Sequence, residues 1–204
     1  MLRVPLAAAA AGAAATTPYA ALYDALAPAR SIAAYDRLIA IEHVGSSAPG
    51  VRPEDIRITI RAKSGAIEVP VAADGGLEFP LSEALRAENP PVETNQPKGS
   101  LALGVNAALR PPHGLVAPWR EIAAALKQAD ALYASASPPH TVRGIEVRFA
   151  PGAPATLTLG ERSERLFAAD ADGRVIVLRD DVVDAEHATL AFSRPPLRIL
   201  PYVE

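Results

Sequence analysis

A regular alternation of apolar and polar residues predicts half-buried β-strands along most of the chain. The clearest example runs from 56 to 61, where three isoleucines alternate with Arg57, Thr59 and Arg61. Side chains of a strand point alternately to its two faces, so this pattern places the isoleucines in a core and the polar residues in solvent. Similar patterns recur at 67–71, 77–81, 101–105, 145–149, 157–159, 175–177, 190–192 and 197–199.

Two helices are predicted among these strands. Apolar residues between 19 and 26 have the i, i+3, i+4, i+7 spacing of one helical face, and we expect Pro28 to end this helix. A longer amphipathic helix is predicted after Pro118, because apolar residues keep helical spacing over 119–132 and proline suits a first helical turn. The residues from 135 to 139 are typical of a linker.

An internal repeat is the most informative feature of the sequence. Residues 74–97 match residues 172–195 without a gap, so that Asp74-Gly75 aligns with Asp172-Gly173. An Asp-Gly pair between alternating stretches favours a tight turn between strands. Apolar positions alone could match by chance, but the shared Asp-Gly, Ala-Glu and Pro positions are harder to explain in that way. We therefore predict an internal duplication.

The predicted fold is mainly β (α+β), with two related small β-sandwich-like units and one amphipathic helix between them. Strand 56–60 is expected to precede the first copy of the repeat, and strand 145–149 the second. A unit of this size would expose a sheet face if it stood alone, so the units should pack together or each form a small sandwich. The expected segments are a signal peptide (1–15), an N-terminal helix and lead-in strand (16–50), a first β unit (51–112), a helix and linker (113–139) and a second β unit (140–204).

The first twenty residues predict export. One arginine near the start is followed by an uncharged run from Val4 to Ala15. The run has about 12 residues, whereas a membrane-spanning helix needs roughly 20. Ala13 and Ala15 fit a signal-peptidase site, with cleavage after Ala20 as the alternative. We expect a periplasmic or secreted protein without stable membrane insertion after cleavage; the other interpretation is an alanine-rich helix that stays on the protein.

Charge and cysteine content narrow the classes of function. The formal net charge is −3, and Lys and Arg are scattered, which argues against a nucleic-acid partner. The chain has no cysteine, which excludes disulfides, thiolate metal sites and cysteine nucleophiles. Its 20 prolines indicate short elements joined by defined loops. No cofactor and no metal site are predicted.

The polar cluster from Asn95 to Ser100 supplies the first candidate site. The side chains of Asn95, Gln96 and Lys98 suit an anionic or peptide ligand. The alternative is a structured turn, in which the amides bond the backbone, the proline fixes the entry and the glycine permits an unusual φ. Residues 193–196 of the second copy lack this cluster, which favours a specialised role for the first copy.

Trp119, the only tryptophan, is the other candidate for binding a ligand or partner. It stands at the start of the predicted amphipathic helix. The alternative role is a packing anchor between helix and sheet, which is typical of a tryptophan in that place.

Three segments resemble a family of uncharacterised envelope proteins of Gram-negative bacteria, a domain of unknown function. They are Asp74-Gly75 with Pro80-Leu81, Ala87-Glu88-Asn89-Pro90, and the cluster from Asn95 to Ser100. Leu22-Tyr23 before them and the helix at Trp119 after them are similar too, and the resemblance covers most of residues 20–204. The family implies a secreted or periplasmic setting, and it offers no activity and no catalytic residue.

Catalytic motifs are sparse. None of the four histidines has metal-site spacing, and neither a Gly-x-Ser-x-Gly motif nor a Walker loop is present. His187 beside Glu186 is the strongest acid–base candidate. We therefore expect a non-enzymatic exported binding or interaction protein of the cell envelope, with an unknown envelope protein or small ligand as partner. The alternative is a periplasmic hydrolase that uses His187 or the turn between Asn95 and Ser100.

Overall fold

The computed structural model of the chain divides into two compact units. Unit 1 comprises Met1–Ser31 and Ala40–Asn106, and unit 2 comprises Ile32–Ile39 and Ala107–Glu204. Strands hold 42% of the residues and helices 22%, in several antiparallel sheets, which confirms the mainly β, α+β fold. The structure describes residues 2–5, 14–135, 139–150, 152, 154–160 and 164–204.

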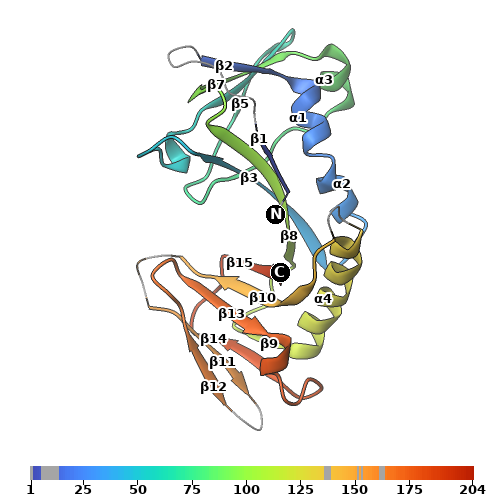
Figure 1. Cartoon of the computed structure of the whole chain (residues 1–204), viewed down its shortest axis with the longest axis vertical. Helices are drawn as coiled ribbons and strands as arrows, with labels where there is room; N and C mark the ends of the chain where they lie inside the picture. Colours follow the sequence, from blue (N-terminus) through green and yellow to red (C-terminus); the bar gives the residue numbers. More distant parts are fainter. Residues whose placement is uncertain (1, 6–13, 136–138, 151, 153, 161–163) are drawn as a thin grey trace. The chain divides into compact units, whose positions relative to one another are not determined.

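Unit 1 is built from the first strands and helices of the chain (Figure 1). α2, β3 and β8 have residues in both units. The elements are β1 (Leu2–Pro5), β2 (Ala14–Pro18), α1 (Tyr19–Ala25), α2 (Pro28–Ile32), β3 (Leu38–Ser46), the 3-10 turn η1 (Pro53–Asp55), β4 (Ile58–Ala62), β5 (Gly65–Val69), β6 (Gly76–Leu77), α3 (Glu83–Glu88), β7 (Pro91–Pro97) and β8 (Leu101–Leu109).

One four-stranded sheet of unit 1 has the order β2-β7-β4-β5. β3 pairs with β6, and β1 pairs with β8. The inner face of the four-stranded sheet carries Ile58, Ile60 and Val92, which are all buried. The alternation predicted for 56–61 is therefore observed, with the isoleucines in the core.

Tyr19, the first residue of α1, anchors this helix in the core of unit 1. It is 0% exposed, and its ring stacks on Phe79 with 5.4 Å between centroids. Its hydroxyl accepts the N–H of Ser82 at 2.9 Å and donates to the carbonyl of Pro80. An aromatic side chain held at both its ring and its hydroxyl fixes the start of α1.

The helix predicted over 19–26 ends before Pro28, as expected: α1 ends at Ala25, and Pro28 begins α2, because the first turn of a helix does not use the missing N–H of proline. One local prediction for unit 1 is wrong. The strand predicted over 77–81 is limited to β6. After Leu77 the chain leaves the ladder, and the N–H of Phe79 donates to Glu42 Oε2 at 2.6 Å.

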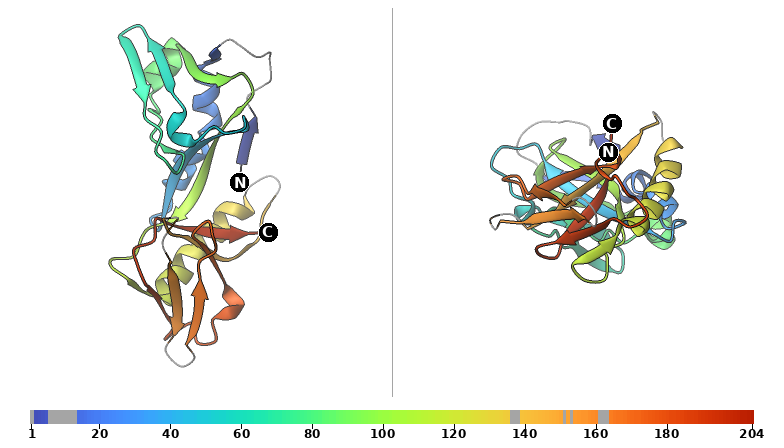
Figure 2. Two further views of the ribbon diagram at one scale, coloured as in Figure 1. Left: turned by 90° about the vertical axis from the view of Figure 1, so that its left-hand side faces the viewer. Right: turned by 90° about the horizontal axis from the view of Figure 1, so that it is seen from below.

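Unit 2 is built from the later elements of the chain (Figures 1 and 2). The amphipathic helix, expected between the units, falls within this one. Its elements are β9 (Val116–Pro118), α4 (Trp119–Ala134), β10 (Val142–Arg148), β11 (Thr156–Gly160), β12 (Arg165–Ala168), β13 (Arg174–Leu178), the 3-10 turn η2 (Arg179–Asp181), β14 (Thr189–Phe192) and β15 (Arg198–Val203).

The core of unit 2 lies among two groups of strands and α4. One sheet has the order β12-β11-β14-β9, and β10 pairs with both β13 and β15. Phe149, directly after β10, contacts Phe192 of β14 edge to face, with 6.5 Å between ring centroids. α4 contacts β9 and β10 and buries Ile122 and Leu126. Aliphatic residues fill most of this core, as the composition predicts.

The two units share an order of strands. The four-stranded sheet of unit 1 has the order β2-β7-β4-β5, and that of unit 2 has the order β9-β14-β11-β12. Corresponding strands therefore stand at the same positions in the two sheets. In each unit the first of these strands ends in a proline that leads into a helix. The N–H of Tyr19 then donates to Pro90 O at 3.0 Å, and the N–H of Trp119 donates to Ala188 O at 2.8 Å. Pro90 and Ala188 are 98 residues apart.

The two Asp-Gly turns also make corresponding bonds. The N–H of Val44 donates to Gly75 O at 2.8 Å, and the N–H of Phe149 donates to Gly173 O at 2.8 Å. The turn of unit 1 is therefore bonded to β3, and the turn of unit 2 to the residue directly after β10. The strands expected before the two copies are both present, as β4 and β10, but they do not correspond to each other, because β4 has the sheet position of β11.

Candidate functional site

Asn95 uses its side chain to hold the backbone of unit 1. Its Oδ1 accepts the N–H of Arg57 at 2.9 Å, and its Nδ2 donates to Asp55 O at 2.8 Å. These bonds tie the end of β7 to the chain that enters β4. Both polar groups of the Asn95 amide are therefore engaged within the protein, as the structured-turn interpretation requires.

Gln96 points into the protein. It is 6% exposed, its Oε1 accepts from the Ser46 hydroxyl at 3.2 Å, and its Nε2 donates to Asn95 Oδ1 at 3.2 Å. A side chain with this burial does not present its amide to a ligand at the surface. Gln96 and Asn95 are thus neighbours in one internal hydrogen-bond network.

A tight turn follows β7. The N–H and the hydroxyl of Ser100 both donate to Pro97 O, at 3.0 and 2.7 Å, and Gly99 has φ 85°. Proline and a glycine with positive φ are the residues that such a turn demands. Lys98 is exposed at its tip, and within the described parts of the chain its ammonium makes no hydrogen bond or ion pair. Lys98 is the one member of the predicted cluster with an uncommitted head group.

Trp119 belongs to unit 2, whereas the cluster from Asn95 to Ser100 belongs to unit 1. It is 3% exposed and is the first residue of α4. Its position corresponds to that of Tyr19 in unit 1. Each residue follows a proline, and its backbone N–H donates to a carbonyl of a distant segment of the same unit. This burial gives Trp119 the packing role that was the alternative prediction.

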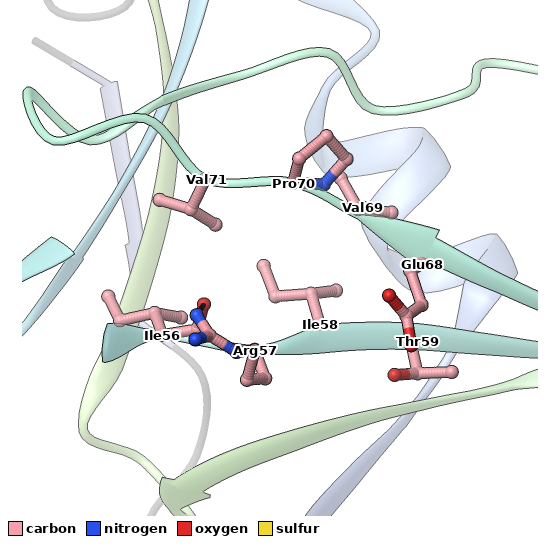
Figure 3. Close-up of a pocket in the computed structure, with 8 residues that line it drawn as sticks. All are labelled: Ile56, Arg57, Ile58, Thr59, Glu68, Val69, Pro70 and Val71. Carbon is pink, nitrogen blue, oxygen red and sulfur yellow. Dashed lines mark hydrogen bonds between the residues drawn. The ribbon is translucent and has the colours of Figure 1, made fainter. Parts of the chain in front are cut away.

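A groove opens in unit 1 where β4 and β5 diverge (Figure 3). Its volume is about 570 Å³. Ile58 and Val69 form the last pair of the β4–β5 ladder, and beyond them the side chains of Ile56 and Val71 line the opening. Arg57 also lines it, and its backbone is held by Asn95. Asn95 therefore supports one wall of the groove without lining it.

The charged groups at this groove are few. Arg57 Nη1 donates to Glu54 O at 2.7 Å and to Ile56 O at 3.3 Å, so the guanidinium is partly engaged by the backbone. Glu68 lies on the other strand beside Thr59 (Figure 3). An aliphatic opening with one cation and one anion suits an apolar side chain.

The outer faces of the two four-stranded sheets differ sharply, although their registers correspond. In unit 1 one cross-strand row contains Thr16, Glu93, Thr59 and Glu68. Next to it, Arg61 Nε donates to Glu93 Oε2 at 2.8 Å. This is an ordinary solvated face, on which charged side chains pair across strands.

The corresponding row in unit 2 contains Val116, Ala191, Thr158 and Leu166. We call the surface around it the outer face of unit 2. The strand residues that the structure describes on this face are all uncharged; they are Val116, Pro118, Thr156, Thr158, Gly160, Leu166, Ala168, Thr189 and Ala191.

A charged residue borders the outer face of unit 2 at one end. A Cβ on Gly160 would meet Glu164 Cγ at 3.5 Å, so Glu164 borders that end. Val116 is 56% exposed and Leu166 is 67% exposed. The sequence analysis did not predict this face. The pattern that could have indicated it is the Thr-x-Thr alternation of β11, together with the uncharged outer positions of the strands that pair with it.

His187, the residue of the hydrolase alternative, lies at the surface of unit 2. Its Nδ1 is 3.0 Å from Asp184 Oδ1, three residues earlier. Glu186, the partner considered from sequence, is exposed. A histidine next to a carboxylate is a common surface pair as well as part of catalytic sites, so this geometry does not favour hydrolysis over a structural pair.

The turn before β13 holds its acidic residues with backbone bonds. Asp170 Oδ1 accepts the N–H groups of Asp172 and Arg174 at 3.0 and 2.8 Å. The bond from Arg174 is the main cause that lowers the pKa of Asp170 below its usual value. Among the described residues, no group of three His, Asp or Glu side chains is arranged to hold a metal ion.

Comparison with known proteins adds no relative. No protein-family model, no curated protein and no solved structure matches the chain. The resemblance to envelope proteins of unknown function therefore stays a prediction from the sequence.

Proposed function

We propose that this chain is a non-enzymatic binding protein of the bacterial cell envelope, and that the outer face of unit 2 binds a protein partner. The contrast between the two sheets carries this proposal. Where unit 1 has Glu68 and Glu93, unit 2 has Leu166 and Ala191 in the corresponding register. A sheet with one face on the core normally alternates with a polar solvent face. An uncharged, partly aliphatic outer face departs from that rule in one unit only.

The size of the face agrees with a binding surface. Four strands spaced about 4.8 Å apart, each contributing several residues, give a flat area of roughly 300 Å². Exposed patches of about 300–600 Å² are the largest on typical monomers and are often functional. A full interface buries about 800 Å² on each partner. The outer face of unit 2 would therefore be the centre of a weak or transient interface.

The chemistry of the face defines the partner. Thr158 and Ala191 are short, so a second flat surface can approach the middle of the sheet closely. The described strand residues of the face offer no counter-ion, so a charged group placed against it would lose its hydration without compensation, which costs about 1–3 kcal/mol or more. The partner is thus a protein with a flat, uncharged surface of aliphatic and hydroxyl side chains.

The envelope location rests on the N-terminal sequence and belongs to the same proposal. Ala14 and Ala15 stand at the start of β2, and Thr17 pairs with Val92 of β7. Cleavage after Ala15 would leave Thr16 to Pro18 in this pairing. Residue 1 and residues 6–13 of the expected signal peptide lie outside the described residues. None of the described helices combines the length and apolar character needed to cross a membrane.

The test is crosslinking of the tagged chain in the intact cells that encode it, followed by mass spectrometry. The variant Ala191→Glu introduces the charge that unit 1 carries at Glu93, and Thr59→Glu is the matched control on the other sheet. We expect one dominant envelope protein with the wild type and with Thr59→Glu, and its loss with Ala191→Glu. With the purified partner, Ala191→Glu should weaken binding by about tenfold or more. Equal binding by both variants would refute the proposed surface.

A further inference from the structure

A second groove, of about 290 Å³, lies entirely within unit 2 beside the first turns of α4. Its floor consists of buried aliphatic side chains, among them Leu109, Ile122 and Ala125. Its rim carries charged residues of both signs. The volume is at the lower end of ligand pockets, which begin at about 300 Å³. A small molecule with an aliphatic part therefore fits the groove better than a macromolecule does.

Gln128 of α4 fixes the acidic side of the rim. Its Oε1 accepts the N–H of Arg37 at 3.0 Å, and its Nε2 donates to the carboxylate of Asp36. The N–H of Arg110 donates to Arg37 O at 3.0 Å, and its Nε donates to Asp36 O. The hydrogen bond from Gln128, followed by the charges of Arg37 and Arg110, lowers the pKa of Asp36. The Asp36 carboxylate is thus ionised, and it already accepts a hydrogen bond from Gln128.

Other charged groups of the rim are uncommitted. In the part of the chain that the structure describes, the guanidinium of Arg37 and the carboxylate of Glu121 make no hydrogen bond or ion pair. Arg110 engages only its Nε in this way, which leaves its two Nη groups. The Arg37 guanidinium, the two Nη groups of Arg110 and the Glu121 carboxylate therefore line the same groove and make no hydrogen bond or ion pair among the described residues.

We propose that this groove binds a small zwitterion, a dipeptide with an aliphatic residue. Arg37 and Arg110 bind its carboxylate, because planar guanidinium groups match carboxylate oxygens. Glu121 binds its ammonium group. The aliphatic side chain covers the floor at Ile122. A simple anion is the poorer ligand, since Asp36 already offsets part of the positive charge and Glu121 repels a second negative group.

Unit 1 does not repeat this site. Its helix α1 begins at Tyr19 as α4 begins at Trp119, and the position that corresponds to Glu121 is Ala21. The carboxylate on the rim of this groove is therefore specific to unit 2. The groove is also distinct from the outer face of unit 2, so the two proposals can fail separately.

Isothermal titration of the full chain with glycyl-L-leucine tests the site, with the N-acetylated and C-terminally amidated forms as comparison ligands. We expect saturable binding with a Kd of about 1 mM or below, and a loss of about tenfold for each blocked form. Arg37→Ala should weaken binding of the free dipeptide by about tenfold, because it removes one of the two guanidinium groups that bind the carboxylate. The fold should be unaffected, since the Arg37 side chain is exposed. Glu121→Gln should bind the free and acetylated forms equally.

Arg120→Gln is the matched control, since Arg120 is exposed on the same turn of α4 and does not line the groove. It should bind as the wild type does. Three results would each overturn the inference: no saturable binding at about 10 mM dipeptide, an unchanged preference for the free dipeptide in Glu121→Gln, or equal weakening by Arg120→Gln. Thermal unfolding of each variant verifies that the fold is intact.

Discussion

Gly75 and Gly173 occupy corresponding turns of the two units, and each lies against a backbone carbonyl of a neighbouring segment, that of Val44 in β3 or that of Phe149 directly after β10. Their φ angles are 81° and 75°. A Cβ on Gly75 would lie 2.6 Å from Val44 O, and one on Gly173 would lie 2.5 Å from Phe149 O. Both the positive φ and the close approach exclude a side chain. The Asp-Gly pairs that suggested a repeat in the sequence thus have the same physical reason in both units.

Gly75→Ala and Gly173→Ala should therefore destabilise their units strongly and to a similar extent. A left-handed conformation costs a residue with a Cβ about 1–2 kcal/mol, and the clash with a backbone oxygen adds to this. Gly50→Ala is the control, because Gly50 has φ 75° with nothing within 4 Å of its Cβ position. Urea unfolding should show a loss larger than that of Gly50→Ala by at least about 1 kcal/mol. Equal losses in all three variants would contradict the turn geometry.

Asn95→Ala should reduce stability, whereas Lys98→Ala should not. Asn95 loses its bonds to the N–H of Arg57 and to Asp55 O, each worth about 0.5–1.5 kcal/mol. Lys98 is exposed at the tip of the turn and loses no such bond. Denaturant midpoints of the two variants check this. If Asn95→Ala were as stable as the wild type, its role in holding the chain before β4 would be wrong.

Protonation of Glu42 should stabilise unit 1, so its contribution to the free energy of unfolding should grow as the pH falls towards the ordinary pKa of a glutamate. Burial is the main cause that raises the pKa of Glu42, and the bond from the Phe79 N–H opposes it only in part. The folded state then binds the proton more tightly than the unfolded state, so this contribution to stability is lost as the pH rises through the folded pKa.

The variant Glu42→Gln removes that titration and keeps an oxygen for the Phe79 N–H. Its stability should vary less with pH than that of the wild type above about pH 4.5, near the ordinary glutamate pKa. Thermal unfolding between pH 4 and pH 8 measures the difference. A wild type whose stability rises through this range, relative to Glu42→Gln, would contradict the sign of the effect.

Export predicts a new N-terminus. Cleavage after Ala15 should give a mature chain that starts at Thr16 and keeps the pairing of Thr17 with Val92. Intact-mass measurement of protein recovered from the periplasm or medium checks this. A chain that retains Met1 and stays in the cytoplasm would contradict the predicted signal peptide.

The alternation of apolar residues predicted much of the fold. The isoleucines of β4 and the helical spacing after Trp119 mark buried faces directly, and the structure has both elements. The short β6 was not predictable from pattern, because the N–H of Phe79 is taken by the side chain of Glu42, which is distant in sequence. Binary patterns record which face is buried, and they do not record such long-range bonds.

The candidate site was less accessible from sequence. The amides of Asn95 and Gln96 looked available for a ligand, but their partners, Arg57 and Ser46, are known only once the chain is folded. The outer face of unit 2 was missed for a related reason. Neither Thr158 nor Leu166 indicates a binding surface on its own. They form an uncharged surface only because strand pairing places them side by side, and that pairing is known only from the structure.

A photo-crosslinking amino acid at position 158 tests the central claim most directly, with the same substitution at position 59 as the matched control. Thr158 and Thr59 have corresponding places in the two sheets, one between Leu166 and Ala191 and the other between Glu68 and Glu93. Irradiation of intact cells should give an adduct of one discrete mass at position 158 that contains a second envelope protein, and no such adduct at position 59. The same adducts at both positions, adducts of this chain with itself alone, or none at position 158 would contradict a partner-binding role for the outer face of unit 2.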